Sequence, residues 1–247
     1  MNEFIPKGYE KENGEKVESI VNDETGRFFF LTNRKFENDI NQTFSNLPSL
    51  AIEKLKKERG ENEPITILDV GAGIDAKSAG QIAEKYGNEK DERVRVFGVD
   101  LTARKNEQGG LNQIIGDALQ LPLQDNSVDI AYSRMALSLI AEMDPDNLEK
   151  GLSEVARTLK QGGVFFVDKT FSEKMEKSVD VEKFQKLGEE LGVVFYTKET
   201  GLFFGTFEKL LKKMKNEYPD WKFLIMAKKP INEDLMKALS LNDKDTV

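Results

Sequence analysis

The residues most suited to chemistry are Asp69, Gly71 and Gly73, which end an apolar run at 65–70 and precede a helix-compatible stretch at 76–86. This pattern is typical of a buried strand that turns tightly into a helix. Glycines at such a turn let a ligand approach the backbone closely. The free N–H groups and the positive end of the helix favour anionic or polar ligand groups. The sequence therefore predicts a ligand site at this turn.

Two further acidic residues end apolar segments downstream. Asp100 closes the segment 97–100, where it can chelate a ribose diol or simply cap a loop. Asp117 follows the segment Ile115-Gly116 and stands next to the small residue Ala118. Because the ends of parallel strands meet at one edge of a sheet, these acids and the glycine turn indicate a site for a nucleoside-containing cofactor.

These segments resemble the class I S-adenosylmethionine-dependent methyltransferases, whose first motif reads acid-x-Gly-x-Gly-x-Gly. The resemblance implies that the backbone of Gly71, Ala72 and Gly73 cradles the methionine part of the cofactor. It also implies that Asp69 orients the methionine ammonium, directly or through water, although Asp69 could instead be structural and hydrogen-bond loop backbone. The third glycine position is Asp75, a departure from the family pattern. Aspartate is a good helix N-cap, but an acid there also places a negative charge close to the cofactor's carboxylate, so both roles stay open.

The same resemblance implies the contacts of the nucleoside. Asp100 would accept hydrogen bonds from both ribose hydroxyls, and Leu101 would pack on the adenine face. Asp117 would accept the adenine amino group, with the Ala118 N–H meeting the ring. Ser133, at the end of a later strand, completes the implied cofactor set. The cofactor is then S-adenosyl-L-methionine, and the product is S-adenosyl-L-homocysteine.

Two more segments, 121–129 and 154–163, resemble stretches of the same family, with Gln161 in place of a proline. Within the first, we expect Asp129 to bond loop backbone rather than a ligand. A nicotinamide-binding Rossmann domain shares the glycine turn and the ribose acid. However, it usually carries all three glycines, and it does not explain the Gly-Asp-Ala segment or the 121–129 stretch.

Composition excludes several kinds of chemistry. The 247-residue chain contains no histidine and no cysteine, which rules out Ser-His-Asp and Cys-His hydrolases, disulfides and thiolate metal sites. We expect no metal. The net charge of −8 argues against a dedicated nucleic-acid binder. No apolar run is long enough to span a bilayer, and no secretory signal is evident, so a cytoplasmic protein is expected.

Strand and helix patterns alternate from residue 65 onward, which predicts a parallel sheet covered on both faces. The fold class is α/β, with a doubly wound, mostly parallel seven-stranded sheet, helices on both faces and an N-terminal helical cap. The expected strands are 65–70, 94–99, 111–116, 128–133, 164–167, 193–198 and 221–227. The expected helices are 50–59, 75–87, 145–160, 180–191 and 206–217, with Gly162 and Gly163 ending the third of them.

Around this domain, placed at 64–229, we expect a flexible arm at 1–26, a cap segment at 27–63 and a polar, frayed tail at 230–247. Caps of this kind often help to enclose a substrate.

The candidates for the acceptor side are Tyr132, Arg134 and Asp168, at the ends of the fourth and fifth strands. Asp168 can serve as a base for an amine or hydroxyl, or form a surface ion pair. Arg134 can clamp an acidic group of the acceptor or the methionine carboxylate. The stretch after the fourth strand lacks the signature of amino-group methylation on adenine or glutamine. Its composition at 134–139 resembles the variable, apolar wall of small-molecule members of the family, so we expect methyl transfer to O or N of a small molecule. An RNA or protein methyltransferase using the lysines at 209–229, and a non-catalytic binding module, remain the alternatives. The sequence does not reveal the oligomeric state.

Overall fold

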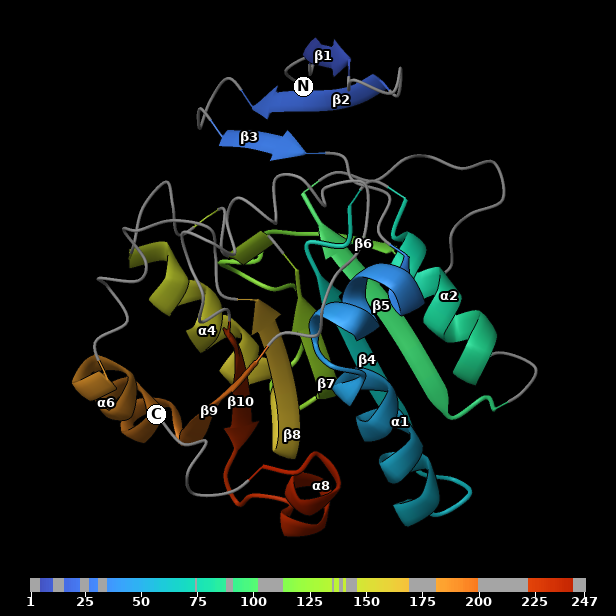
Figure 1. Ribbon diagram of the computed structural model, residues 1–247, viewed down its shortest axis with the longest axis vertical. Coiled ribbons are helices and arrows are strands. Elements are labelled where there is room, and N and C mark those ends of the chain that lie inside the picture. Colours follow the sequence, from blue (N-terminus) through green and yellow to red (C-terminus); the bar gives the residue numbers. More distant parts are fainter. Residues whose placement is uncertain are drawn as a thin grey trace.

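The protein is organised around a seven-stranded sheet, shown by a computed structural model in Figure 1. The described residues are 5–10, 16–22, 27–30, 35–73, 75–87, 91–101, 113–134, 136–137, 140, 146–168, 181–199 and 222–241. The strands are β4 (Ile65–Val70), β5 (Val94–Asp100), β6 (Gln113–Ile115), β7 (Val128–Ser133), β8 (Leu159–Asp168), β9 (Val193–Glu199) and β10 (Lys222–Lys228). Their order is β6-β5-β4-β7-β8-β10-β9, and β10 runs antiparallel to both of its neighbours. The prediction of a mostly parallel, seven-stranded sheet is confirmed.

Helices cover both faces of this sheet, as predicted. On one face lie α1 (Leu47–Glu58), α2 (Lys77–Tyr86) and α8 (Glu233–Ala238). On the other lie α4 (Asp146–Thr158) and α6 (Val181–Leu191). Each face carries its own cluster of buried apolar side chains, so the central strands are apolar on both sides. The expected helix at 206–217 lies outside the described residues.

The connection from α4 to β8 differs from the prediction. The helix ends at Thr158, and β8 begins at once, whereas a helix to residue 160 closed by Gly162 and Gly163 was expected. The pairing with β7 jumps from Val128 opposite Leu159 to Ile130 opposite Val164, so both glycines lie in a bulge inside the strand. Gly162 has a φ of +74°, which explains why glycine stands there.

The N-terminal segment also differs from the expected flexible arm. β1 (Ile5–Glu10), β2 (Lys16–Asn22) and β3 (Arg27–Phe30) form a separate antiparallel sheet. β-branched residues in β2 and three consecutive phenylalanines in β3 favour strands, and this outweighs the polar composition that suggested an arm. Figure 1 shows this small sheet beyond the edge where β5 and β8 end.

Residues 36–58 are helical, in keeping with the predicted helical cap. They comprise a short π-helix, η1 (Phe36–Asn41), and α1. The backbone N–H of Phe36 donates to Gln81 Oε1 in α2 over 2.7 Å, and Lys85 pairs with Glu37 at 2.6 Å. η1 is therefore fixed to α2, whereas α1 belongs to the helical layer on the sheet. The role of 27–63 as a cap stays a prediction.

The expected frayed tail is wrong for residues 233–241. The Asn232 side chain caps α8 by accepting from the Leu235 N–H over 2.9 Å. Leu235, Met236, Leu239 and Leu241 are buried, and α8 packs against α1. Leu235, Met236 and Leu239 stand at helical spacing among charged neighbours and make an amphipathic face, and its burial outweighs the polar composition of the segment.

Candidate cofactor site

The glycine turn after β4 adopts the geometry that its sequence predicts. Gly71 and Gly73 both have a φ of +77°, in the left-handed region that favours glycine. A Cβ on Gly71 would come closer than 3.0 Å to the Cβ of Ala136, a distance that real side chains do not show. The N–H groups of Gly71 and Ala72 donate to the Val99 carbonyl over 2.8 and 3.1 Å. The turn is therefore folded back onto the end of β5, with no room for a side chain at position 71.

Asp100, the last residue of β5, lies at this turn. Its Oδ2 accepts a hydrogen bond from the Gly73 N–H over 2.9 Å, and the Gln113 side chain donates to the Gly73 carbonyl over 3.1 Å. Leu101 follows and is half-buried. The structure thus brings together the glycine turn and the acid that the sequence predicted to bind a ribose.

Asp117 and Ala118 lie one strand further along. The Gly116 N–H donates to the Asp100 carbonyl over 2.9 Å, which ties this segment to the end of β5. Asp117 accepts from the Leu119 N–H over 2.8 Å, and Ala118 is buried beside it. The three segments predicted to contact methionine, ribose and adenine therefore follow one another along the carboxyl edge of β4, β5 and β6. Their strands lie beside the point, between β4 and β7, where the strand order reverses.

Glu154 and Arg157 of α4 hold the segment that leads from this edge into β7. Glu154 accepts from the Leu121 N–H over 2.8 Å, and the Arg157 guanidinium donates to the carbonyls of Leu121 and Leu123 and pairs with Asp125 at 2.6 Å. The hydrogen bond from Arg157 lowers the pKa of Glu154, and Glu154 and Asp125 in turn raise the pKa of Arg157. The sequence showed both residues only through the family resemblance, and the structure gives them this anchoring role.

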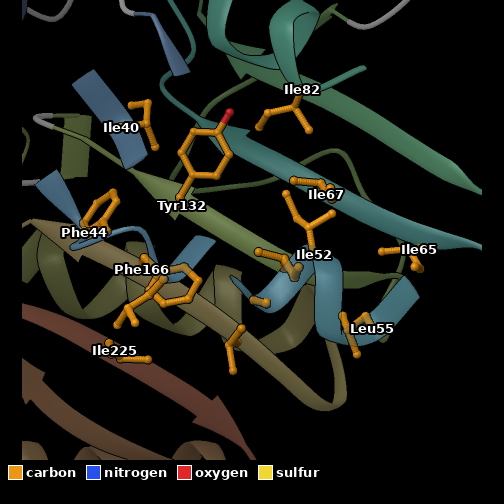
Figure 2. Close-up of a cluster of buried hydrophobic side chains, with 14 of the residues drawn as sticks. Ile40, Phe44, Ile52, Leu55, Ile65, Ile67, Ile82, Tyr132, Phe166 and Ile225 are labelled. Atoms are coloured by element: carbon orange, nitrogen blue, oxygen red, sulfur yellow. The ribbon is translucent and has the colours of Figure 1, made fainter. Parts of the chain in front are cut away.

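Asp69 lies behind the turn and is only 2% exposed. Its Oδ2 accepts from the Ser78 hydroxyl, and the Ser78 oxygen lies 3.0 Å from the Tyr132 hydroxyl. Tyr132 is fully buried in the cluster drawn in Figure 2, together with Ile67 and Ile82. The expectation that Tyr132 faces the acceptor is corrected, because its ring packs in the core and its hydroxyl bonds Ser78. Sequence reasoning missed Ser78 altogether, since a serine inside a helix carries no distinctive signal.

The ends of the neighbouring strands β7 and β8 carry three of the predicted residues, Ser133, Arg134 and Asp168. Ser133 is buried, and its hydroxyl accepts from the Leu137 N–H over 3.4 Å, so it caps the turn that follows β7. The Arg134 guanidinium lies 4.0 Å from the Asp39 carboxylate of η1. Asp168 is 8% exposed and ends β8. The structure thus gathers the two acceptor-side candidates, Arg134 and Asp168, at the same edge as the glycine turn.

Asp75 does not occupy the N-cap position of α2. The residue that directly precedes the helix is Ala76, with a φ of +41°, so the turn places a different residue there. The role of Asp75 near the cofactor stays a prediction.

Asp129 lies at the opposite, amino edge of the sheet. Its carboxylate, 1% exposed, pairs with Arg59, accepts from the Thr66 N–H over 2.7 Å and pairs with Lys160 at 2.8 Å. The expected structural role is confirmed. A hollow of about 380 Å³ beside Arg59, Asp129 and Gly162 lies at this same edge. It is therefore separate from the carboxyl edge where the motifs meet.

The lysines at 209–229, which an RNA or protein methyltransferase would use, are only partly described. Lys228 donates to the Ala156 carbonyl over 2.6 Å and to Asn126 over 3.1 Å, and burial lowers the pKa of its ammonium group. The Lys228 side chain thus joins β10 to the end of α4. The other lysines of this group, Lys209, Lys212, Lys213 and Lys215, lie outside the described residues.

Within the described part of the chain, no three acidic side chains gather as a metal site, and no helix is long and apolar enough to cross a membrane.

Comparison with known proteins identifies the family. A protein-family model described as "Hypothetical methyltransferase" matches residues 5–227. The chain belongs to this family. Its sheet order and its motifs are those of the class I S-adenosylmethionine-dependent methyltransferases, so the resemblance seen in the sequence is confirmed.

The individual proteins that this chain matches are only distantly similar to it. The 24-methylenesterol C-methyltransferase 2 of Arabidopsis thaliana is 25% identical over 181 residues, which cover 66% of this chain and 46% of the relative. The malonyl-[acyl-carrier protein] O-methyltransferase of Methylococcus capsulatus is 32% identical over 105 residues, covering 40% of this chain and 35% of the relative. The chain thus matches less than half the length of either. A Haloferax volcanii methyltransferase, solved with the Trm112 methyltransferase activator, is 17% identical with a TM-score of 0.47, covering 76% of this chain and 97% of that one.

Proposed function

We propose that the protein transfers a methyl group from S-adenosylmethionine to an oxygen or nitrogen of a small-molecule acceptor. The observation that carries this proposal is the hydrogen bond between the Asp100 carboxylate and the Gly73 N–H, which joins the ribose acid to the glycine turn. This junction lies at the carboxyl edge beside the reversal of strand order, where open α/β sheets bind their ligands. Family membership supports the same reaction.

The cofactor would lie along this edge. The backbone of Gly71, Ala72 and Gly73 would cradle its methionine part, and Asp100 would accept its ribose hydroxyls. Leu101, Asp117 and Ala118 would surround the adenine. Ser133 would act indirectly, because its hydroxyl fixes the turn that carries Ala136 against Gly71.

When bound, the cofactor supplies an activated methyl group on a sulfonium, and the protein's task is chiefly alignment. Alignment of this kind is worth up to about 7–11 kcal/mol. Asp168 would accept the proton that an attacking hydroxyl or amine loses, and Arg134 would orient an acidic group of the acceptor. Arg134 directly follows β7, the neighbour of β4, and Asp168 ends β8, the next strand. Asp168 is nearly buried, which favours a role as a base over a surface ion pair.

Calorimetric titration with S-adenosylhomocysteine tests the cofactor site, using two variants of one residue. Asp100→Ala removes both carboxylate oxygens, whereas Asp100→Asn keeps an acceptor for the Gly73 N–H and lacks the second acceptor for a ribose. We expect micromolar binding in the unchanged protein and a loss of about tenfold or more, equal to about 1.4 kcal/mol, in both variants. Binding by the two variants that equals the unchanged protein would remove Asp100 from the site.

The acceptor side needs a separate experiment. A screen of small hydroxy, amino and carboxylic compounds with labelled cofactor would find the substrate class. With an acceptor in hand, Asp168→Asn should lower turnover by about 100-fold or more while leaving S-adenosylhomocysteine affinity unchanged. Unchanged turnover would exclude Asp168 as the base.

A further inference from the structure

A chain of three buried polar side chains stands directly behind the glycine turn. Asp69 of β4 and Tyr132 of β7 are paired in register on adjacent parallel strands. Ser78 reaches them from α2, and its oxygen bonds both the Asp69 carboxylate and the Tyr132 hydroxyl. All three residues are at least 98% buried. They come from three elements that meet only in the folded protein.

The direction of the hydrogen bonds follows from the chemistry of the groups. A serine hydroxyl carries one proton, and Ser78 donates it to Asp69. The oxygen of Ser78 can then only accept from Tyr132, so the proton of the Tyr132 hydroxyl points to Ser78 over 3.0 Å. Each hydroxyl polarises the next, and the chain ends on the carboxylate of Asp69.

The hydroxyls of this chain compensate for the burial of the Asp69 carboxylate. A carboxylate that is 2% exposed loses most of its hydration, which is costly unless donors replace the lost water. The Tyr132–Ser78 chain supplies such a donor and fixes the orientation of the carboxylate two residues before Gly71. The apolar surroundings of Tyr132, visible in Figure 2, keep water away from the chain.

We infer that Ser78 and Tyr132 are positioning residues that hold the Asp69 carboxylate toward the amino-acid end of the bound cofactor. This inference rests on the proposed function and deepens it, because it assigns the recognition of the methionine ammonium to a specific set of hydroxyls. Neither residue touches the cofactor in this arrangement; both act through Asp69.

The test uses two ligands that differ only at the amino-acid end. S-adenosylhomocysteine carries the ammonium and carboxylate, whereas 5′-methylthioadenosine keeps the adenosine and sulfur but lacks both. Ser78→Ala should raise the dissociation constant of S-adenosylhomocysteine by about fivefold to tenfold, as expected for a lost hydrogen bond to a charged group. Tyr132→Phe, which removes the hydrogen bond between the two hydroxyls, should raise it in the same direction. The dissociation constant of 5′-methylthioadenosine should change by less than about twofold, because this ligand lacks the ammonium that Asp69 would bind.

The chain offers a closely matched control. Tyr86 is also buried, donates to a buried serine, Ser49, over 2.9 Å, and packs against the ring of Phe36. Tyr132 packs against the same ring at the same centroid distance of 6.4 Å. Tyr86→Phe therefore removes an equivalent buried hydroxyl bond that does not lead to Asp69, and it should leave the affinities for both ligands unchanged.

The outcomes separate the two proposals. The inference would be overturned if the variants lowered the affinity for both ligands equally, or for neither. The hydroxyls would then serve only the fold. A loss of S-adenosylhomocysteine affinity in Tyr86→Phe as large as in Tyr132→Phe would overturn it too. Failure of the unchanged protein to bind either ligand would instead reject the proposed function.

Discussion

Replacement of Gly71 by alanine tests whether the glycine turn depends on close packing as well as on backbone conformation. The new Cβ would meet two obstacles. It would force an L residue to a φ of +77°, and it would come closer than 3.0 Å to the Cβ of Ala136. The left-handed conformation costs about 1–2 kcal/mol. Overpacking of a filled site adds about 1–3 kcal/mol. We therefore expect Gly71→Ala to lower the free energy of unfolding by about 2–5 kcal/mol.

Two further variants separate these contributions. Gly192 also has a positive φ, of +65°, but a Cβ there would meet no atom within 4 Å. Gly192→Ala should therefore show the backbone cost alone, about 1–2 kcal/mol. Adding Ala136→Gly to Gly71→Ala removes the obstructing Cβ and leaves the Ala136 Cα at 3.5 Å, an ordinary contact. The double variant should regain most of the packing cost.

Urea unfolding of the four proteins, with S-adenosylhomocysteine titrations alongside, gives the answer. We expect Gly71→Ala to weaken ligand binding by more than about tenfold and Gly192→Ala to leave it unchanged. If Gly71→Ala is no more destabilising than Gly192→Ala, or if Ala136→Gly restores nothing, the turn is not packed as described and the reasoning fails.

Three other perturbations test the anchoring of the site. Asp129→Asn should lower the free energy of unfolding by about 2–3 kcal/mol, since it leaves two partly exposed cations without their buried carboxylate. Calorimetry should show that the affinity for S-adenosylhomocysteine is unchanged. Glu154→Gln should destabilise the protein in a pH-dependent way. Arg157 lowers the pKa of Glu154 below its ordinary 4.5, so the carboxylate stabilises the fold above that pH and this contribution is lost as pH falls through the lowered pKa. Urea unfolding between pH 7 and 3 should therefore show the difference from the unchanged protein shrinking only below about pH 4.5; a constant difference would contradict the ion pair. Leu235→Ala should cost about 2–4 kcal/mol, because its side chain is fully buried, and a neutral effect in thermal unfolding would mean that α8 does not pack on the domain.

The sequence predicts the sheet and the glycine turn well, because both depend on local patterns. The run at 65–70 becomes β4 with no change of bounds, and the strands expected at 94–99 and 193–198 differ by one residue. The bulge at Gly162 and the packing of α8 were missed for a physical reason. A bulge depends on the register with the neighbouring strand, and α8 is stabilised by burial against α1, so neither is recorded in local composition.

Tyr132 shows the same limit within the site. All six residues of β7 are buried, so alternation along the strand does not reveal which side chains face the site and which face the core. Its proximity to the end of a strand favoured a contact with the acceptor. The register with Asp69, set by the folded sheet, directs its hydroxyl to Ser78 instead.

Asp100 and Asp129 show how partners, rather than residue type, decide whether an acid serves a ligand or the fold. Asp129 receives a backbone N–H and two cations, so its charge is neutralised within the protein and a ligand would have to displace an ion pair. Asp100 is half-exposed at the carboxyl edge, and its Oδ2 bonds a glycine N–H of the turn that would hold the ligand. Asp100 therefore lies next to the backbone that would hold the ligand, at the edge where a ribose hydroxyl would approach it. Both acids lie close to the ends of apolar strands, and the opposite edges of the sheet give them these different partners.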